Sequence, residues 1–520
     1  MATTPFGQRV KNWLLADGGL PIVWAALTCI ALYPVWRSRL LPMLDTANHL
    51  GLARGWHDYR DPASRVAEFY ELRVRVVPYW LFYASINALL YVVPIEIANK
   101  LFLSAYLVLF PLSVLALARA LRRSPWLALF AFPLCFNQNW IYGFASYLMS
   151  VTFSVFAMAA LIAYLDRRQL RYAIALGVCC VVSYLGHIMP WFLFGLCAIP
   201  ILIMSWRKWQ AGVVAAAVML PSVVMAVTAV LDEQSEHTYI KDTAFAATFR
   251  DFPTSVIEFP RRVMELFPGN LDALVLFLMV AALVAMWVLA RRGRDAEPVG
   301  DPAVRVLTVC LWVLGLAYVS LPYQITKPMS WWYVAPRIPS LMMVYVALLP
   351  RLRIVGRMRL LLVPIVIGAI ALPLKLSKLY RSFSARNAAM MRLVEELPRG
   401  APTLVVVRNM MRGSGSEEKS GDPASSGPVY WHFSSWPMAL KGGYSPYQFD
   451  QGIPLRPKKA LVTPPWGSTD AFSFRQAPAF EFYIVRDATE EMDREPSVHL
   501  EKRLGDWSLY KRIGEITEEP

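Results

Sequence analysis

The chain has 520 residues, of which 56% are hydrophobic and only 17% are charged, and its mean hydropathy is +0.41. A water-soluble fold of this length cannot hide that much apolar chain, because a single hydrophobic core stops growing at about 250–300 residues. The formal net charge is +15, but no basic segment interleaves with stacking aromatic residues in a soluble context, so nucleic-acid binding is excluded.

Long stretches without charged residues indicate the class of protein. A helix that crosses a bilayer needs about 20 predominantly apolar residues, and residues 124–165 contain no Asp, Glu, Lys or Arg. We therefore predict a polytopic α-helical membrane protein. Eleven spans are expected, at 18–36, 97–118, 126–137, 143–165, 172–187, 190–206, 211–231, 271–290, 304–321, 338–350 and 359–376.

Alternate loops between these spans are basic, and the intervening loops are nearly uncharged or acidic. The basic loops lie at 119–123, 166–171, 207–208, 291–305 and 351–359. Because Lys and Arg hold short loops on the cytoplasmic side, these five loops are predicted to be cytoplasmic. The C-terminal tail then lies outside.

The N-terminal part permits two topologies. Residues 78–94 are apolar enough to span, although the segment is barely long enough. If it spans, the N-terminus is outside and the loop 37–77 is cytoplasmic. If it lies flat at the outer interface, the N-terminus is inside and the loop 37–96 is exported, and the local charges do not decide between the two.

The chain divides into a transmembrane domain, 1–380, and a soluble exported domain, 381–520. The loop 232–270 is long enough to form a cap of its own. In the tail, an amphipathic helix at 384–397 and strands at 403–407, 480–485 and 507–513 predict an α/β domain. The Gly-, Ser- and Pro-rich segment 412–428 has no periodicity and is predicted to be a loop.

Two polar residues open the first loop directly beyond the first span. Asp45 and His49 are four residues apart, so they share one face of a helix. A carboxylate held next to an imidazole can serve as a general base or as half of a metal or phosphate site. Alternatively, Asp45 caps the helix that begins at Thr46, since Asp is a favoured N-cap residue.

Two further polar features lie at the predicted outer ends of spans. His187 is flanked by apolar residues and is either a satisfied structural group or part of a site, since ionisable residues within spans are functional candidates. The polar hairpin 137–143 either contacts a sugar or satisfies the backbone where two helices meet.

The loop 321–337 carries aromatic residues and cations on the side where the positive-inside rule disfavours them. Trp331 belongs to an aromatic cluster that is also typical of an interfacial anchor. Lys327 and Arg337 are candidate ligands of a lipid phosphate, because a buried Arg needs an anionic partner. The pair Arg261 and Arg262, in the loop 232–270, is a weaker candidate for the same role.

The sequence contains neither a nucleotide-binding fingerprint nor a P-loop, an HExxH motif or a GxSxG motif. The predicted cytoplasmic loops are too short for a nucleotide-binding domain. Any donor substrate must therefore arrive through the membrane or from the far side.

This layout resembles the GT-C membrane glycosyltransferases, which use polyprenyl-phosphate-linked sugars and include aminoarabinose transferases and protein O-mannosyltransferases. The similarity lies in the acid after the first span (Asp45, then His49), the interfacial helices that follow, the many spans, the outer loop 327–337 and the C-terminal outer domain. The resemblance implies that 78–94 lies flat, that there are eleven spans, and that Asp45 is exported.

The resemblance also implies roles for residues and partners. Asp45 would be the general base that deprotonates an acceptor hydroxyl for inverting attack on the anomeric carbon. The donor would be a polyprenyl-phosphate-linked sugar, the acceptor an envelope glycan, lipid or protein, and the location the bacterial cytoplasmic (inner) membrane, with a periplasmic or extracellular C-terminal domain. Many relatives have an acidic pair where this chain has Asp45-Thr46, so a second carboxylate (Asp58, Asp61 or Glu96) and a divalent metal, Mg or Mn, stay open.

Two other classes of function remain compatible with the sequence. A polysaccharide transporter or assembly factor would have similar spans and basic loops but would need no fixed outer carboxylate. A membrane O-acyltransferase would use a His within a span, and His187 could supply it.

Overall fold

The structure is a computed structural model that describes residues 19–236, 246–266, 269–292, 301–327, 331–408, 429–445, 454–458 and 472–514. The chain forms two compact units. The first unit comprises Met1–Pro34, Ser104–Asn139 and Ser146–Leu376, and the second comprises Val35–Leu103, Trp140–Ala145 and Ser377–Pro520.

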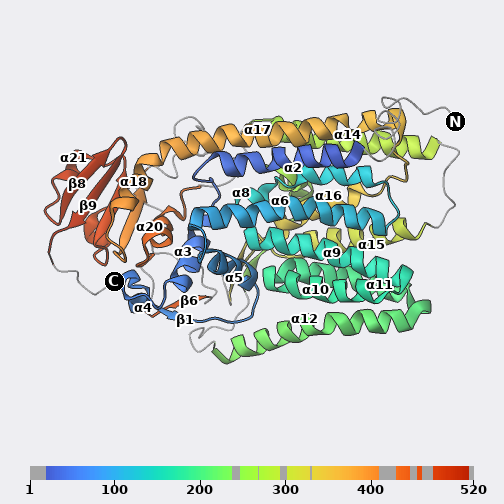
Figure 1. Cartoon of the computed structure of the whole chain (residues 1–520), viewed down its shortest axis with the longest axis horizontal. Coiled ribbons are helices and arrows are strands. Elements are labelled where there is room, and N and C mark those ends of the chain that lie inside the picture. The colour runs from blue at the N-terminus through green and yellow to red at the C-terminus, as the bar shows by residue number, and fades with distance from the viewer. Residues whose placement is uncertain are drawn as a thin grey trace, which may run out of the picture. The chain divides into compact units, whose positions relative to one another are not determined.

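The first unit is built mainly from helices (Figure 1), and the long ones are apolar. Those that lie mostly within it are α2 (Gly19–Arg37), α6 (Ile95–Ala120), α7 (Ala131–Leu134), α9 (Ala145–Arg167), α10 (Leu170–Gly186), α11 (Ile188–Met204), α12 (Trp209–Glu236), α13 (Phe252–Met264), α14 (Leu271–Arg292), α15 (Pro302–Ser320), α16 (Ile338–Ala347) and α17 (Val363–Arg386).

Seven helices in the described part of the chain are long and apolar enough to cross a membrane. They are Gly19–Arg37, Ile95–Ala120, Ala145–Arg167, Trp206–Ala229, Leu271–Arg291, Pro302–Ser320 and Gly356–Arg386, and each coincides with a predicted span. The other four predicted spans are also helical but shorter, at 125–134, 170–186, 188–204 and 338–347. The prediction of a polytopic α-helical membrane protein is confirmed, and the count of eleven spans stays a prediction.

An ion-pair cluster joins three of the basic loops. Asp301 caps α15 by accepting a hydrogen bond from the backbone of Ala303. The same carboxylate accepts from Arg123 at 2.6 Å and lies 3.1 Å from Arg351. Burial alone would raise the pKa of Asp301, but the Ala303 N–H and the two guanidinium groups hold the pKa below its usual value. These three loops therefore lie at the same end of the first unit.

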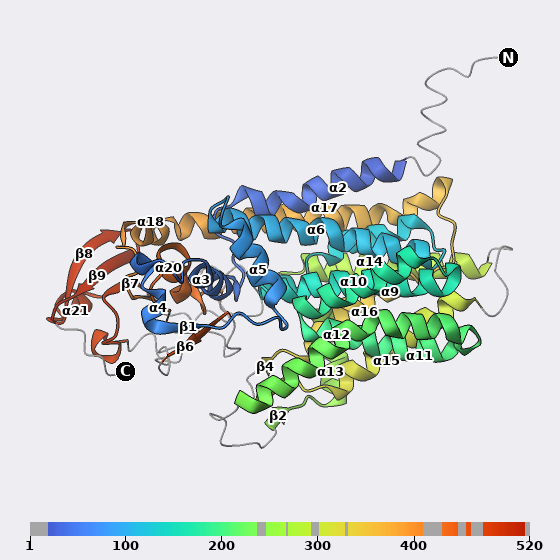
Figure 2. The same ribbon diagram turned by 60° about the horizontal axis from the view of Figure 1, so that its bottom comes forward.

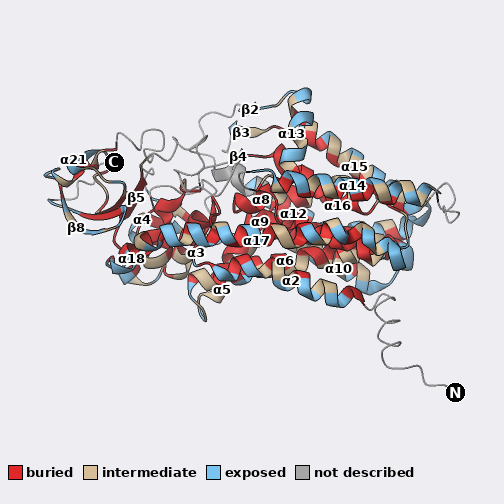
Figure 3. Ribbon diagram, turned by 90° about the horizontal axis from the view of Figure 1, so that it is seen from above, coloured by how far each residue is buried: buried red, intermediate tan, exposed pale blue. Residues whose placement is uncertain are grey.

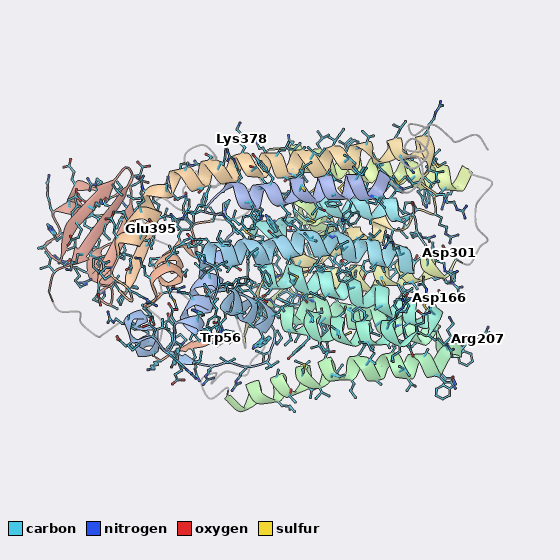
Figure 4. The ribbon with its side chains drawn as sticks, in the orientation of Figure 1. Trp56, Asp166, Arg207, Asp301, Lys378 and Glu395 are labelled. Carbon is cyan, nitrogen blue, oxygen red and sulfur yellow. The ribbon has the colours of Figure 1, made fainter. Side chains whose placement is uncertain are left out.

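Two further contacts bring in the remaining basic loops. Arg122 donates to Asp166 at 2.8 Å, and the ammonium group of Lys208 donates to the carbonyl of Leu165 at 2.8 Å. Figure 4 shows Asp166 and Arg207 at the end of the helices where Asp301 lies. All five loops that were predicted to share one side of the membrane thus meet at one end of the unit.

The second unit contains the shorter elements of the first loop and of the C-terminal region. They are α3 (Thr46–His57), α4 (Val66–Phe69), β1 (Tyr70–Leu72), α5 (Trp80–Leu89), α18 (Ala388–Glu396), β5 (Thr403–Val407), α20 (Trp436–Lys441), β6 (Leu455–Pro457), β7 (Phe482–Arg486), α21 (Glu490–Asp493), β8 (Val498–Leu504) and β9 (Trp507–Arg512). The first loop and the C-terminal region pair directly, because β1 runs antiparallel to β6 with Tyr70 opposite Pro457.

The C-terminal region contains a four-stranded mixed sheet in the order β5-β7-β9-β8. Strands β5 and β7 are parallel, and the other two pairs are antiparallel. The three strands predicted from apolar runs are confirmed, with small changes at their ends. Strand β8 was missed because it is an edge strand with charged residues such as Lys502 and Arg503, which suit an exposed edge. The predicted helix at 384–397 is present as the end of α17 followed by α18, and the predicted loop 412–428 lies outside the described residues.

Helix α5 is the only regular helix in the described segment 78–94, and it has 10 residues. At 1.5 Å per residue it is about 15 Å long, roughly half the thickness of a bilayer's hydrocarbon core. The residues after Leu89 turn before α6 begins at Ile95. This length supports the interpretation that the segment does not span.

Candidate functional site

The Asp45 carboxylate faces a histidine and does not cap the helix that follows it. Asp45 stands at the N-cap position of α3, but its side chain makes no capping hydrogen bond, so the capping alternative is wrong in this structure. Instead, its Oδ1 lies 3.3 Å from Nε2 of His432. The side chains of Asp45 and His432 are 11% and 5% exposed, so the pair is largely shielded from water.

Close packing of α20 and the short helical turn 433–435 against α3 places His432 beside Asp45. Two glycines on one face of α3 lie at this contact. A Cβ at Gly51 would make an ordinary contact with the carbonyl oxygen of Ser435 at 3.4 Å, whereas a Cβ at Gly55 would crowd the side chains of Leu455 at 2.5 Å and Met438 at 2.8 Å. The spacing of four residues puts both glycines on the same side of the helix.

His49, predicted to act with Asp45, turns its ring toward α5. Its Nδ1 lies 2.8 Å from the hydroxyl of Tyr83, and its backbone N–H donates to the carbonyl of Asp45. Burial raises the pKa of Tyr83, and Tyr79 and Asp45 raise it further, so this hydroxyl stays neutral. His49 therefore links α3 to α5.

The polar hairpin 137–143 positions the backbone at Asp45. The N–H of Asp45 donates to the carbonyl of Tyr142 at 3.0 Å, and the N–H of Leu44 donates to that of Ile141 at 3.1 Å. Gly143 has φ +75°, and a Cβ there would meet the backbone nitrogen of Asp45 at 3.1 Å. A side chain at this position would be both strained and crowded. This part of the hairpin thus has the structural role that was one of its two predicted roles.

The three carboxylates considered as partners of Asp45 are engaged in ion pairs elsewhere. The pairs are Asp58 with Arg54 and Arg399, Asp61 with Arg399, and Glu96 with Arg39. Among the residues that the structure describes, no three His, Cys, Asp or Glu side chains are grouped to hold a metal ion. The described donors thus do not assemble ligands for Mg or Mn, and we derive no step through a metal.

Arg337 lies in the first unit and is 5% exposed. Its Nε donates to the carbonyl of Tyr333 at 2.7 Å, and its Nη2 donates to the carbonyl of Trp332 at 3.1 Å. Its guanidinium carbon lies 5.4 Å from the ring centre of Tyr147, whose hydroxyl donates to the carbonyl of Arg337. These contacts hold the guanidinium in one position.

His187 lies beside Arg337 and is fully buried. Its Nδ1 accepts a hydrogen bond from the N–H of Met189 at 3.0 Å, which caps α11. A neutral imidazole has one acceptor nitrogen, so Nε2 then carries the proton. Because Nε2 is 3.1 Å from Nη1 of Arg337, two hydrogen-bond donors converge. An oxyanion that accepts from both donors would satisfy this arrangement.

The remaining residues of the predicted phosphate-binding loop are placed differently. Trp331, in β4 (Trp331–Trp332), lies 5.6 Å from the ring of His187. Lys327 ends β3 (Gln324–Lys327), and its side chain is outside the described part of the structure. Strand β3 pairs with both β4 and β2 (Ala246–Thr248), so the loop 321–337 is joined to the loop 232–270. Figure 2 shows β2 and β4 near α13.

Arg262, not Arg261, connects α13 to Arg337. Arg261 is 69% exposed and pairs with Glu265. Arg262 is 11% exposed, pairs with Glu258 at 2.7 Å, and donates to the hydroxyl of Tyr333 at 2.7 Å. Tyr333 is buried at φ +63°, a region that costs free energy for a residue with a bulky side chain. Tyr333 therefore accepts two hydrogen bonds, one at its hydroxyl from Arg262 and one at its carbonyl from Arg337.

Glu258 pairs with two arginines, Arg262 within α13 and Arg250 just before the helix. Burial alone would raise the pKa of Glu258, but Arg262 and Arg250 hold the pKa below its ordinary value. Arg250 pairs with the same carboxylate and packs over the ring of Tyr323. The sequence contained a signal for this network, because Glu258 and Arg262 are four residues apart on one helix face.

The structure brings together some of the predicted site residues. In the first unit, Arg337, His187 and Trp331 are in contact, and Arg261 is not part of the group. In the second unit, Asp45 and His49 are adjacent on α3, and each bonds to a residue that the sequence analysis missed. His432 and Tyr83 gave no local signal, because they are polar residues on separate elements.

The apolar helices and the additional mixed sheet define a polytopic membrane protein with an α/β region. No protein-family model matches the sequence, and no curated protein matches it either. Solved structures do match. Two of them are crystal structures of ArnT from Cupriavidus metallidurans, which have the same fold.

The structure of ArnT bound to undecaprenyl phosphate has a TM-score of 0.53 and 12% sequence identity, and the match covers 97% of this chain and 100% of ArnT. The apo structure has a TM-score of 0.50 and 12% identity, with coverage of 96% and 98%. The near-complete coverage of both chains confirms that this chain has the membrane fold of ArnT, the kind of fold that the sequence layout indicated.

Proposed function

We propose that this protein is a membrane glycosyltransferase that moves a sugar from a polyprenyl-phosphate donor to an envelope glycan, lipid or protein acceptor. The observation that carries the proposal is the shielded Asp45 carboxylate, held by His432 at the start of α3 in a chain with the fold of ArnT. The undecaprenyl phosphate bound to ArnT supports a donor of this chemical class.

Asp45 acts as the general base in this proposal. Its carboxylate takes the proton from an acceptor hydroxyl while the hydroxyl oxygen forms a bond to the anomeric carbon. The bond from that carbon to the phosphate oxygen breaks, and polyprenyl phosphate leaves with the electron pair. His432, whose Nε2 lies 3.3 Å from Oδ1, orients the carboxylate in this proposal, and Oδ2 receives the proton of the acceptor. His432 is thus a positioning residue.

Arg337 and His187 supply an anion site in the first unit. Both present N–H donors, and the guanidinium is held by the carbonyls of Tyr333 and Trp332. A phosphate accepts well from such donors because its oxygens are charged. This arrangement also argues against a membrane O-acyltransferase that uses His187 as its base, since Nδ1 caps α11 and Nε2 faces a cation.

The chain is proposed to lie in the bacterial cytoplasmic membrane with its N-terminus inside and the C-terminal region outside. The five basic loops at one end of the first unit support a single cytoplasmic face. The second unit, which holds Asp45, then acts on the outer side, where a lipid-linked donor has no need of a nucleotide.

The test begins in a strain that lacks the protein. Mass spectrometry of its lipids identifies the polyprenyl-linked sugar that accumulates, and this lipid then serves as the substrate for purified protein. We expect Asp45→Asn to fold normally and to lose about 10²-fold or more in sugar transfer, the scale of a lost general base. A well-folded Asp45→Asn protein with full activity would refute the assigned mechanism and favour the non-enzymatic transporter or assembly factor.

A further inference from the structure

Helix α13 turns the face with Ser255, Glu258 and Arg262 toward the rest of the first unit. Ser255 is buried, and its carbonyl accepts a hydrogen bond from the hydroxyl of Tyr318 at 2.7 Å. Glu258 pairs with Arg262, which in turn donates to Tyr333. These contacts place the two formal charges at 258 and 262 on the inner side of the helix.

The opposite face of α13 is apolar and exposed. The exposed fractions are 76% for Ile257, 65% for Phe252 and 52% for Val256. Pro253 and Pro260 are exposed on the same side. Residues 252, 256 and 260 follow one another at intervals of four and so form one stripe of the helix. Figure 3 shows the exposed positions along α13.

Helix α18 of the second unit has the reverse arrangement. Its apolar Met391 and Val394 are buried, whereas Arg392 and Glu395 are exposed. A helix that faces water buries its apolar stripe and exposes its charges in this way. Both α13 and α18 have an apolar face and a polar face. They differ in which face is exposed: the apolar face in α13 and the polar face in α18.

The reversed polarity of α13 suits a lipid environment. Water around Phe252, Val256 and Ile257 would leave a contiguous apolar stripe unburied, which soluble surfaces avoid. Acyl chains favour such residues and disfavour charges, which then turn toward protein partners. In the sequence α13 lies between two spanning helices, α12 and α14, whose exposed side chains are also apolar. Examples are Val213, Leu220, Val224, Phe277, Val280 and Val284.

We propose that α13 is an interfacial membrane helix whose stripe of Phe252, Val256 and Ile257 is immersed in the acyl chains of one leaflet. The partner is therefore a phospholipid surface. Arg261, which is 69% exposed at the margin of the stripe, is positioned to reach the headgroup phosphates. The inference stands independently of the glycosyltransferase activity, since it depends only on the polarity of α13.

The full-length protein is reconstituted in nanodiscs of phosphatidylethanolamine and phosphatidylglycerol with a photoreactive benzoylphenylalanine at position 257. After irradiation, mass spectrometry is expected to find phospholipid adducts at that residue. A second variant, labelled at Val256, repeats the test if the first fails to fold. Arg392 of α18 is the matched control, because it is an exposed position on an amphipathic helix and is expected to form no lipid adduct.

Labelling at Phe277 of α14, a spanning helix, provides the positive control. Lipid adducts at Phe277 without adducts at 256 or 257 would show that α13 faces water and would overturn the proposal. Cross-linked dimers at 257 in place of lipid adducts would assign the stripe to a second copy of the chain and would overturn it as well.

Discussion

At the scale of single residues, the contact between Asp45 and His432 is the feature that distinguishes this chain from one with an acidic pair. A carboxylate beside a second carboxylate experiences repulsion, whereas a carboxylate beside an imidazole accepts a hydrogen bond. The partner determines which oxygen is free. Oδ1 faces His432 at 3.3 Å, and the proposed mechanism therefore assigns the acceptor hydroxyl to Oδ2.

Substitution of His432 tests its positioning role. We expect His432→Ala to lower kcat by up to about 10²-fold, because a carboxylate without its donor loses the productive orientation. KM should change little. His432→Gln should recover part of kcat, since the glutamine amide can donate to Oδ1. The control is His499→Ala, which alters an exposed histidine of β8 and should leave kcat unchanged. An unaltered kcat in His432→Ala would contradict the role.

Arg337 carries the corresponding prediction for the anion site. Arg337→Ala should weaken binding of undecaprenyl phosphate by about 10-fold or more, since a charge-assisted hydrogen bond contributes roughly 1.5–3 kcal/mol. Arg337→Lys should restore only part of it, because a single ammonium cannot replace the planar fork. Arg122→Ala, which removes an exposed pair with Asp166, is the control. Equal lipid binding by Arg337→Ala and by the unaltered protein would show that Arg337 only anchors its loop.

At the scale of elements, α13 shows how an ion pair fixes the rotation of a helix. Asp251 caps its start by accepting from the N–H of Thr254 at 2.8 Å. Glu258 and Arg262, one turn apart, then define the inward face. Sequence reasoning treated Arg261 and Arg262 as equivalent candidates because neighbouring residues differ only in helical phase. Glu258 distinguishes the two arginines, because only Arg262 lies four residues after it on the same helix face.

The depressed pKa of Glu258 gives α13 a pH dependence of known sign. A carboxylate with a pKa lowered by folding contributes stability above its unfolded value of about 4.3. That contribution is lost as pH falls through the folded pKa. We therefore expect the unfolding temperature in nanodiscs to fall below pH about 4.3, with a smaller fall in Glu258→Gln.

At neutral pH, Glu258→Gln should itself lower the unfolding temperature by about 1 °C, because a loss of roughly 1 kcal/mol is divided by an unfolding entropy that grows with chain length. Arg261→Ala removes a pair whose arginine is mostly exposed and should have a smaller effect. Parallel acid profiles for Glu258→Gln and the unaltered protein would assign the acid sensitivity to other carboxylates.

At the scale of the whole molecule, the hydropathy pattern was sufficient for the fold class, because each long span is a local property of about 20 residues. The second unit was not predictable in this way. It gathers residues 35–103 with the C-terminal region, and the contact of Asp45 with His432 joins segments that are far apart in sequence. Hydropathy and local periodicity carry no information about such pairing, so Asp45 was found and its partner was not.

The topology prediction also belongs to the whole chain. Fluorescent or enzymatic reporters fused to the two ends are expected to lie on opposite sides of the membrane, with the N-terminal reporter in the cytoplasm. The physical reason is the excess of Arg and Lys in loops that meet at one end of the first unit. Reporters on the same side would require an even number of spans. Asp45 would then lie on the cytoplasmic side if the segment 78–94 is the additional span.

The cluster around Asp301 has a consequence for biogenesis. During synthesis the loop with Arg123 leaves the ribosome first, Asp301 follows much later, and Arg351 emerges last. The three-residue cluster therefore cannot close until α16 has been translated, although α9 to α12 and α14 are already available for insertion. A chain truncated before Arg351 would hold Asp301 with one arginine in place of two, so this face is completed only late in synthesis.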